Sequence, residues 1–322
     1  MKNKKIYRDK MSINKKITDV LKKKEFTLSV EIVPPRNGED ISELFKKIEQ
    51  LKTIKVDFIS VTKGAGGSLR GGTLPISYFI KNKYKINTIA HFTCRDYSIK
   101  EVENNIVDHN YFGVNNILAL RGDPPVGSPD IPHDKGEYHK YAYQLVHQLN
   151  NLNDGKYLPR EGYDEGSFKE GLPTDFCVGV ACDPNHADIK QEIRFFRKKA
   201  EAGASFAITQ MIFDLKRYVN YVKESEKEGI NIPIIPGIRP FTSLKQLTFM
   251  EEKFNIPIPE KLKKELEGLT KEEAKEKSIK YIVELCRALK DVKAPGIHFF
   301  ILNDIETLSM VISGLKELVA IC

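Results

Sequence analysis

Short apolar runs alternate with longer amphipathic stretches along most of this chain. The runs that predict β-strands span residues 28–33, 56–62, 86–92, 114–120, 176–182, 204–209, 232–237 and 296–301. Most of them are continuously apolar, which is typical of parallel strands that are covered by helices. The stretches with helical spacing between them span residues 39–52, 73–83, 98–110, 136–150, 187–202, 214–228, 243–253 and 304–317.

This alternation predicts an α/β fold, a (β/α)8 TIM barrel, because eight strand–helix units fit within one chain of this length. A doubly wound parallel sheet is the alternative. Three segments exceed a minimal barrel: a helix predicted at 12–24, a polar exposed loop at 151–175, and extra helices at 258–290 before strand eight. We therefore expect a basic leader with a short helix at 1–24 and a single catalytic domain at 25–322.

The composition is that of a globular enzyme, with 41% hydrophobic and 30% charged residues. The net charge of +7 is confined to one end, because residues 1–24 carry ten Lys and Arg against two Asp and the remainder sums to −1. No aromatic or glycine pattern accompanies these lysines, so no nucleic-acid partner is expected. The chain also lacks an apolar stretch of roughly 18 residues and a secretory signal, so we expect a cytoplasmic protein without a membrane partner.

Two of the predicted strands end at a carboxylate that is closely followed by two prolines. Glu31 ends the first run, and the turn Arg121-Gly122-Asp123 follows the fourth. Strand pairing stops there because proline has no N–H to donate. In a parallel barrel the carboxyl ends of the strands form one rim, which carries the active site. The other residues expected at this rim are Thr62, His91, Thr93, Cys182, Gln210, Pro236 and Gly237.

Each of these polar residues has a functional and a structural interpretation. Glu31, flanked by apolar residues, is expected to be partly desolvated, which raises the pKa of a carboxyl toward that of a general acid; the alternative is a solvated carboxylate. Asp123 either pairs with Arg121 or places a negative charge beside an electron-poor ring. The amide of Gln210 either forms hydrogen bonds to a bound heterocycle or satisfies the backbone groups of the loop.

The five cysteines include no Cys-x-x-Cys pair, which argues against an iron–sulfur cluster, a structural zinc site and a disulfide framework. A metal site built from His91, Cys94, Cys182 and His186 is conceivable. Single histidines and thiols at strand ends are commonly packing or cofactor-stacking residues, however, so no metal is expected. No P-loop and no Gly-x-Gly-x-x-Gly motif is present, which disfavours phosphate transfer.

Six segments at the predicted strand ends carry motifs that are individually weak but specific when taken together in this order. They are residues 29–36, 58–65, 90–94, 118–125, 202–214 and 234–238. Together they resemble the methylenetetrahydrofolate reductase family, and the resemblance covers about 25–303. It implies reduction of 5,10-methylenetetrahydrofolate to 5-methyltetrahydrofolate by hydride transfer from reduced FAD, in one-carbon metabolism and methionine biosynthesis. It also implies NAD(P)H or an electron-delivering partner subunit as reductant, and we expect a homo-oligomer.

The resemblance also assigns residues. Glu31 is implied as the general acid and Asp123 as a charge beside the flavin and folate, while Gln210 and Gln246 are implied to bind the substrate. The residues implied to line the FAD site are Thr62, Ala65, His91, Arg121, Gly122, Asp123, Tyr141, Ala142, Cys182, His186, Glu192 and Lys199.

Some positions depart from the family pattern. Cys182 replaces a tyrosine, Glu192 an aspartate, and Asp304 an arginine associated with folate binding. Two other functions stay open: a flavin-free folate-linked methyltransferase barrel, and a non-catalytic partner subunit of a redox complex.

Overall fold

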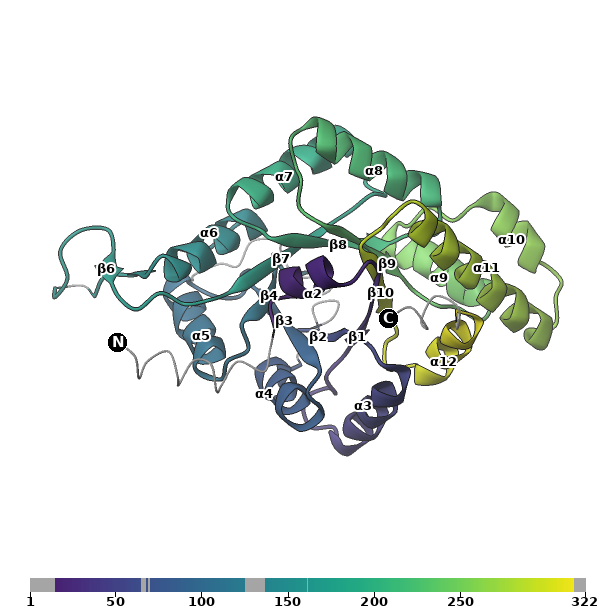
Figure 1. The fold of residues 1–322 in the computed structure, drawn as a ribbon, viewed down its shortest axis with the longest axis horizontal. Helices are drawn as coiled ribbons and strands as arrows, with labels where there is room; N and C mark the ends of the chain where they lie inside the picture. The colour runs from purple at the N-terminus through teal and green to yellow at the C-terminus, as the bar shows by residue number, and fades with distance from the viewer. Residues whose placement is uncertain (1–14, 65–67, 69, 125–136, 161, 316–322) are drawn as a thin grey trace.

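The computed structural model describes residues 15–64, 68, 70–124, 137–160 and 162–315. Eight parallel strands form a closed barrel in the order β1-β10-β9-β8-β7-β4-β3-β2 (Figure 1). The strands are β1 (Thr27–Ile32), β2 (Phe58–Val61), β3 (Asn87–Thr93), β4 (Asn116–Leu120), β7 (Cys177–Cys182), β8 (Phe206–Met211), β9 (Ile234–Ile238) and β10 (Gly296–Phe300). The predicted TIM barrel is confirmed, and closure of the sheet excludes the doubly wound alternative.

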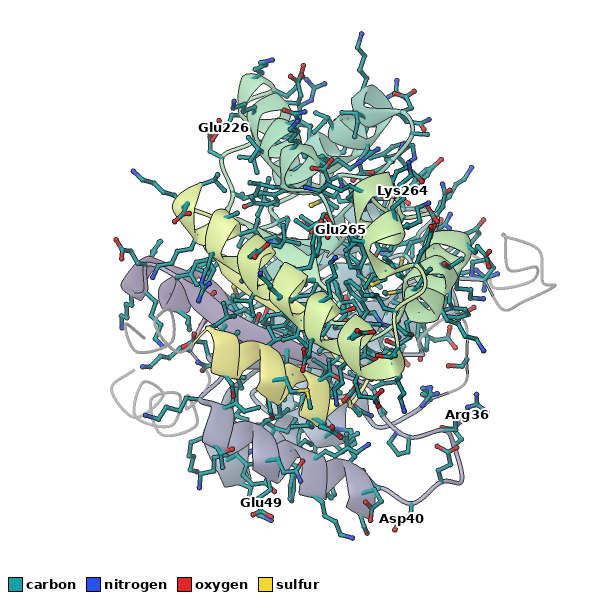
Figure 2. The ribbon with its side chains drawn as sticks, turned by 90° about the vertical axis from the view of Figure 1, so that its right-hand side faces the viewer. Arg36, Asp40, Glu49, Glu226, Lys264 and Glu265 are labelled. Atoms are coloured by element: carbon teal, nitrogen blue, oxygen red, sulfur yellow. The ribbon has the colours of Figure 1, made fainter. Side chains whose placement is uncertain are left out.

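Helices surround the barrel on its outer side (Figure 1). They are α3 (Ser42–Ile54), α4 (Thr73–Phe79), α5 (Ile99–Tyr111), α6 (Ala142–Asn153), α7 (Ile189–Glu201), α8 (Leu215–Lys227), α9 (Leu244–Phe254) and α12 (Ile305–Gly314). The extra helices before the last strand are confirmed as α10 (Glu260–Leu266) and α11 (Lys271–Asp291). Of the charged residues labelled in Figure 2, Glu49, Glu226, Lys264 and Glu265 lie on these helices, whereas Arg36 and Asp40 lie on the loop between β1 and α3.

Successive strand residues face alternately the barrel interior and the helices, because the side-chain period of a strand is two. The interior cluster is Phe58, Ile89, Leu118, Cys177, Phe206, Ile208 and Ile235, joined by Ile17. Ile17 comes from the N-terminal helix α2 (Ile17–Lys23), which lies across the N-terminal end of the barrel (Figure 1). Asn116 holds it there, since its Oδ1 accepts from Ile17 N at 3.1 Å. The helix predicted at 12–24 is thus confirmed over Ile17–Lys23, whereas residues 1–14 lie outside the described residues.

Glycine is required where two neighbouring strands bring a ring against the backbone inside the barrel. Gly179 pairs with Phe206, and a Cβ at Gly179 would lie 2.3 Å from that ring. At Gly237 a Cβ would lie 2.4 Å from the ring of Phe300. These glycines give the aromatic side chains room to fill the interior.

Three predicted elements differ from the structure. Residues 151–175 are not a plain loop: 151–153 end α6, and β5 (Lys156–Tyr157) pairs antiparallel with β6 (Lys169–Glu170). Strands of two residues are too short for periodicity to detect. The helix expected at 73–83 ends in a π-helical turn, η2 (Ile80–Tyr84). The helix expected from 136 begins at 142, because the side chain of Gln144 bonds to Tyr141 N and caps it there.

Candidate active site

A cavity of about 990 Å³ opens at the C-terminal end of the barrel strands. Its lining includes the acid–base and amide residues that the sequence placed at the rim. The predicted site residues in the lining are Glu31, Thr62, His91, Arg121, Gly122, Asp123, Tyr141, Ala142, Cys182, His186, Glu192, Lys199 and Gln210. Residues from strands far apart in the sequence thus meet in one site. Ala65 lies outside the described residues.

Glu31 occupies an inward-facing position near the end of β1, where only 12% of its side chain is exposed. Burial raises the pKa of its carboxyl to about 8, and the positive charge of Arg239 partly opposes this effect. The desolvated environment predicted for Glu31 is therefore confirmed. At neutral pH the group is protonated and able to donate a proton.

Two buried histidines lie near Glu31 inside the barrel. His91 on β3 places Nε2 3.6 Å from Glu31 Oε2, and burial lowers the pKa of His91 to about 3. His298 on β10 contacts Ser29 through Nδ1 at 2.8 Å and Ser60 through Nε2 at 3.2 Å. Burial lowers its pKa to about 3 as well, so both rings are neutral. Sequence reasoning missed His298, although the alternation of residues 296–300 could have placed it inside the barrel.

The turn after β4 is shaped by Gly122. Its φ is +94°, and a Cβ there would lie 3.1 Å from Thr93 Cβ. Arg95 N donates to Arg121 O at 2.9 Å, which keeps this turn against the end of β3. Asp123 follows as an exposed carboxyl in the cavity lining. A glycine is therefore needed to bring Arg121 and Asp123 to the rim.

A basic side chain lines the part of the cavity near β7. Lys199 on α7 donates through Nζ to Ala181 O at 2.8 Å. Glu192, two turns earlier on the same face of α7, accepts from Asp183 N at 3.1 Å and from the Tyr221 hydroxyl at 3.3 Å. Burial raises the pKa of Glu192, and the charge of Lys199 counteracts that rise. Lys199 therefore holds the end of β7, and Glu192 holds the start of the loop that follows it.

Cys182 lies mainly in the layer between barrel and helices, because Ala181 takes the neighbouring inward-facing position. Burial raises the pKa of its thiol, which is therefore neutral. Cys94 is also buried, and its Sγ donates to His139 O at 3.5 Å. In the part of the chain that the structure describes, no group of three or more His, Cys, Asp or Glu could hold a metal ion.

The two predicted substrate glutamines differ in position. Gln210 lines the cavity, as a substrate-binding residue would. Its Oε1 also accepts from Met211 N at 2.9 Å, so it satisfies a backbone group as well, which was the structural interpretation of this residue. Gln246 lies in the first turn of α9, where its Oε1 accepts from Thr242 N at 2.8 Å. It is not part of the described cavity lining. The structure therefore does not bring Gln246 together with the other site residues.

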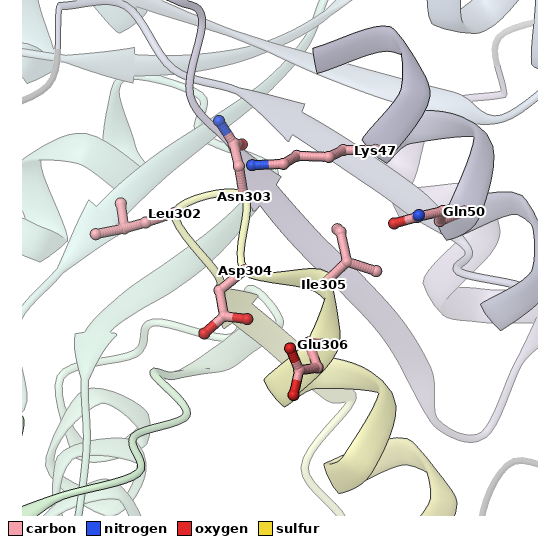
Figure 3. Close-up of a pocket in the computed structure, with 7 residues that line it drawn as sticks. All are labelled: Lys47, Gln50, Leu302, Asn303, Asp304, Ile305 and Glu306. Atoms are coloured by element: carbon pink, nitrogen blue, oxygen red, sulfur yellow. The ribbon is translucent and has the colours of Figure 1, made fainter. Parts of the chain in front are cut away.

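A second pocket of about 440 Å³ lies between α3 and the loop after β10. Figure 3 shows Lys47 reaching from α3 toward Asn303, while the carboxylates of Asp304 and Glu306 point away from it. Asp304 caps α12 by accepting from Thr307 N at 3.1 Å and from Thr307 Oγ1 at 2.7 Å. Helix capping is thus a structural reason for an aspartate at position 304.

Among the described residues, every helix is too short or too polar to cross a membrane.

The sequence profile and the similar proteins of known name agree on one family. The sequence profile described as "Methylenetetrahydrofolate reductase" matches residues 16–316. The chain is 28% identical to "Methylenetetrahydrofolate reductase (NADH) 1" of Arabidopsis thaliana over 91% of this chain and 49% of the relative. It is 29% identical to "5,10-methylenetetrahydrofolate reductase" of Escherichia coli (strain K12) over 88% of each chain. The chain thus spans about half the length of the plant relatives that it matches, but most of the bacterial one.

The fold is similar to that of a solved structure. It is an uncharacterized protein from Clostridium thermocellum that binds two copies of 5-methyl-5,6,7,8-tetrahydrofolic acid. The TM-score is 0.58 at 16% identity, with 94% of this chain and 98% of the other covered. At this identity the similarity concerns the barrel fold.

Proposed function

Because the chain belongs to the methylenetetrahydrofolate reductase family, we propose that it reduces 5,10-methylenetetrahydrofolate to 5-methyltetrahydrofolate with FAD as cofactor. The observation that carries this proposal is Glu31, a nearly buried carboxyl with a pKa of about 8 that lines the large cavity at the rim of the barrel. A carboxyl that stays protonated at neutral pH is the group that an acid-assisted ring opening needs. The bacterial relatives that are named for this activity align with 88% of the length of this chain.

The residues around the cavity fit FAD. Thr62 Oγ1 is buried and has no hydrogen-bond partner among the described residues, although Thr62 lines the cavity. A ligand hydroxyl or carbonyl would satisfy it. Lys199 and Arg121 offer positive charge for a pyrophosphate. The other residues proposed to hold the cofactor are Ala65, His91, Gly122, Asp123, Tyr141, Ala142, Cys182, His186 and Glu192. FAD, when bound, supplies the hydride.

The residues of the chain handle the proton and the charge. We assign Glu31 as the general acid: its carboxyl donates a proton to the nitrogen that leaves the one-carbon bridge of the substrate. The carbon–nitrogen bond then breaks, and the resulting iminium carbon accepts the hydride. Asp123, an exposed carboxylate at the rim, is proposed to stabilise the positive charge of the iminium. Gln210 is proposed to bind the folate ring. Gln246 is proposed to bind it as well, which requires a movement of α9 toward the cavity because Gln246 does not line it.

Purified protein incubated with FAD provides the test. We expect flavin absorption bands from the bound cofactor, bleaching of these bands by a reductant without oxygen, and formation of 5-methyltetrahydrofolate when substrate is added. Bleaching by NADH or NADPH identifies a self-sufficient enzyme, whereas bleaching only by a stronger reductant indicates an electron-delivering partner subunit. Protein that binds no flavin, or that binds it without forming product, would refute the proposal in favour of a methyltransferase or a non-catalytic subunit. A cytoplasmic location and a homo-oligomeric state stay predictions.

A further inference from the structure

His298 has its hydrogen bonds fully assigned inside the barrel. Ser29 Oγ donates to Ile297 O at 3.0 Å, which uses the single proton of that hydroxyl. Ser29 must therefore accept at its 2.8 Å contact with His298, so Nδ1 of His298 carries the proton. Nε2 is then the acceptor for the hydroxyl of Ser60 at 3.2 Å. The ring is neutral and both of its nitrogens are satisfied.

His91 is the opposite case. Its Nε2 is buried without a hydrogen-bond partner among the described residues, yet it lies 3.6 Å from Glu31 Oε2. An unsatisfied buried polar atom costs about 1–3 kcal/mol, so a nearby donor would be used if one exists. The ring of His91 is neutral, which leaves one of its nitrogens free to accept. A small rotation of the Glu31 side chain would close the gap to hydrogen-bonding distance.

Ser60, Phe300 and Arg239, which adjoin or act on Glu31, are weaker acceptors for its proton than a neutral imidazole nitrogen. On β2, Ser60 is its register partner and is engaged by His298, and on β10 the facing residue is Phe300. The charged group that acts on Glu31 is Arg239, directly after β9, and Arg239 is itself influenced by Asp304. Arginine has no acceptor site. Among the described side chains that act on or adjoin Glu31, His91 alone combines proximity with an unsatisfied ring nitrogen.

We propose that His91 is a positioning residue for Glu31, whose protonated carboxyl donates a hydrogen bond to His91 Nε2. This bond orients the carboxyl and its proton before the substrate binds. The carboxyl then turns from His91 toward the leaving nitrogen of the substrate. The proton stays on Glu31 while it bonds to His91, so no charge is created in the barrel interior. The catalytic meaning rests on the proposed function, but the Glu31–His91 pair itself is a property of the unliganded chain.

Infrared difference spectroscopy of the purified chain tests the pair without requiring turnover. The carbonyl stretch of protonated Glu31 is identified as the band that Glu31→Gln removes. In wild type we expect this band at the position of a strongly hydrogen-bonded carboxyl, and in His91→Phe we expect it at the position of a weakly bonded one. His139→Gln is the matched control, because His139 is another buried histidine but bonds to Gln148 instead. A band that is identical in wild type and His91→Phe would overturn the proposal.

A second measurement leaves His91 intact, in case His91→Phe does not fold. Nitrogen-15 spectra of histidine-labelled protein should show an unprotonated Nε2 for His91 in wild type. Its chemical shift should change in Glu31→Gln, because an amide is a weaker donor than a carboxylic acid. A protonated Nε2, or a shift that does not respond to Glu31→Gln, would contradict the proposal. Failure of the proposed function looks different, since it abolishes product formation while these spectra stay as expected.

Discussion

The side-chain amide of Asn303 bonds to both backbone polar groups of Val33. Nδ2 donates to Val33 O at 3.0 Å, and Oδ1 accepts from Val33 N at 3.1 Å. This amide ties the loop after β10 to the end of the strand that carries Glu31. The loop is strained, since Leu302 and Asn303 have φ of 45° and 65°. Such conformations persist when the surrounding structure enforces them, and they cluster at functional sites.

The first prediction concerns this anchor. We expect Asn303→Gly to destabilise the fold by about 1–3 kcal/mol, because two backbone hydrogen bonds are lost while the left-handed backbone stays permitted. Asn303→Ala should cost about 1 kcal/mol more, since alanine is strained at positive φ. Denaturant unfolding of both variants gives the comparison. A glycine variant as stable as wild type would show that the amide does not hold the loop.

The pH dependence of the folate half-reaction follows from Glu31. The pKa of Glu31 is about 8, so the acid is protonated below that pH and loses its proton above it. We expect the rate of folate reduction to fall about tenfold per pH unit above that value. Rapid mixing of reduced enzyme with substrate at a series of pH values measures this decrease in rate. A rate that stays constant to about pH 10 would exclude Glu31 as the acid.

Glu31 also makes folding stability depend on pH. Folding raises the pKa of its carboxyl from the ordinary value of 4.5 to about 8, so the folded chain keeps a proton that the unfolded chain releases in this range. Stability from this group is complete below about pH 4.5 and is lost as the pH rises to about 8. Glu31→Gln should therefore unfold less readily than wild type at about pH 9, by a few kcal/mol. Glu25→Gln, at an exposed position, is the control that should leave stability unchanged.

Gly179 gives a prediction about the barrel interior. Gly179→Ala should destabilise the protein by about 1–3 kcal/mol, because the added methyl group meets the ring of Phe206. Gly71→Ala is a suitable control, since the nearest atom to a Cβ there is 3.6 Å away. Thermal unfolding of the two variants makes the comparison. Equal melting temperatures would mean that the interior around Phe206 is loosely packed.

Lys199 gives a prediction about the cofactor. Lys199→Met should weaken FAD binding about tenfold or more, because a charge-assisted bond to an anionic cofactor is worth about 1.5–3 kcal/mol. Lys223→Met removes an exposed lysine on α8 and should leave the affinity unchanged. Equilibrium dialysis of FAD measures both variants. Equal affinities would remove Lys199 from the proposed cofactor site.

The barrel was predictable because continuous apolar runs mark parallel strands, and the rim because prolines end β1 and the turn after β4. The desolvation of Glu31 followed from its apolar neighbours. These features depend on residues close together in the sequence, where periodicity and turn chemistry act.

Other features depend on contacts between distant segments, which one sequence does not reveal. Lys81 is buried because its Nζ donates to Phe112 O and Gly113 O, at 3.2 and 2.8 Å. His298 finds its partners on β1 and β2. Cys182 lies mainly on the helix side because the alternation of β7 places Ala181 inward. Gln246 caps its own helix, which motif resemblance alone did not indicate.

Separate measurement of the two half-reactions in Glu31→Gln tests the central claim most directly. The variant, loaded with FAD, should be reduced by the electron donor at a rate close to that of wild type. The reduced variant should then fail to form 5-methyltetrahydrofolate from 5,10-methylenetetrahydrofolate, with a rate lowered by about a thousandfold. Folate reduction at the wild-type rate would contradict the assignment of Glu31 as the acid.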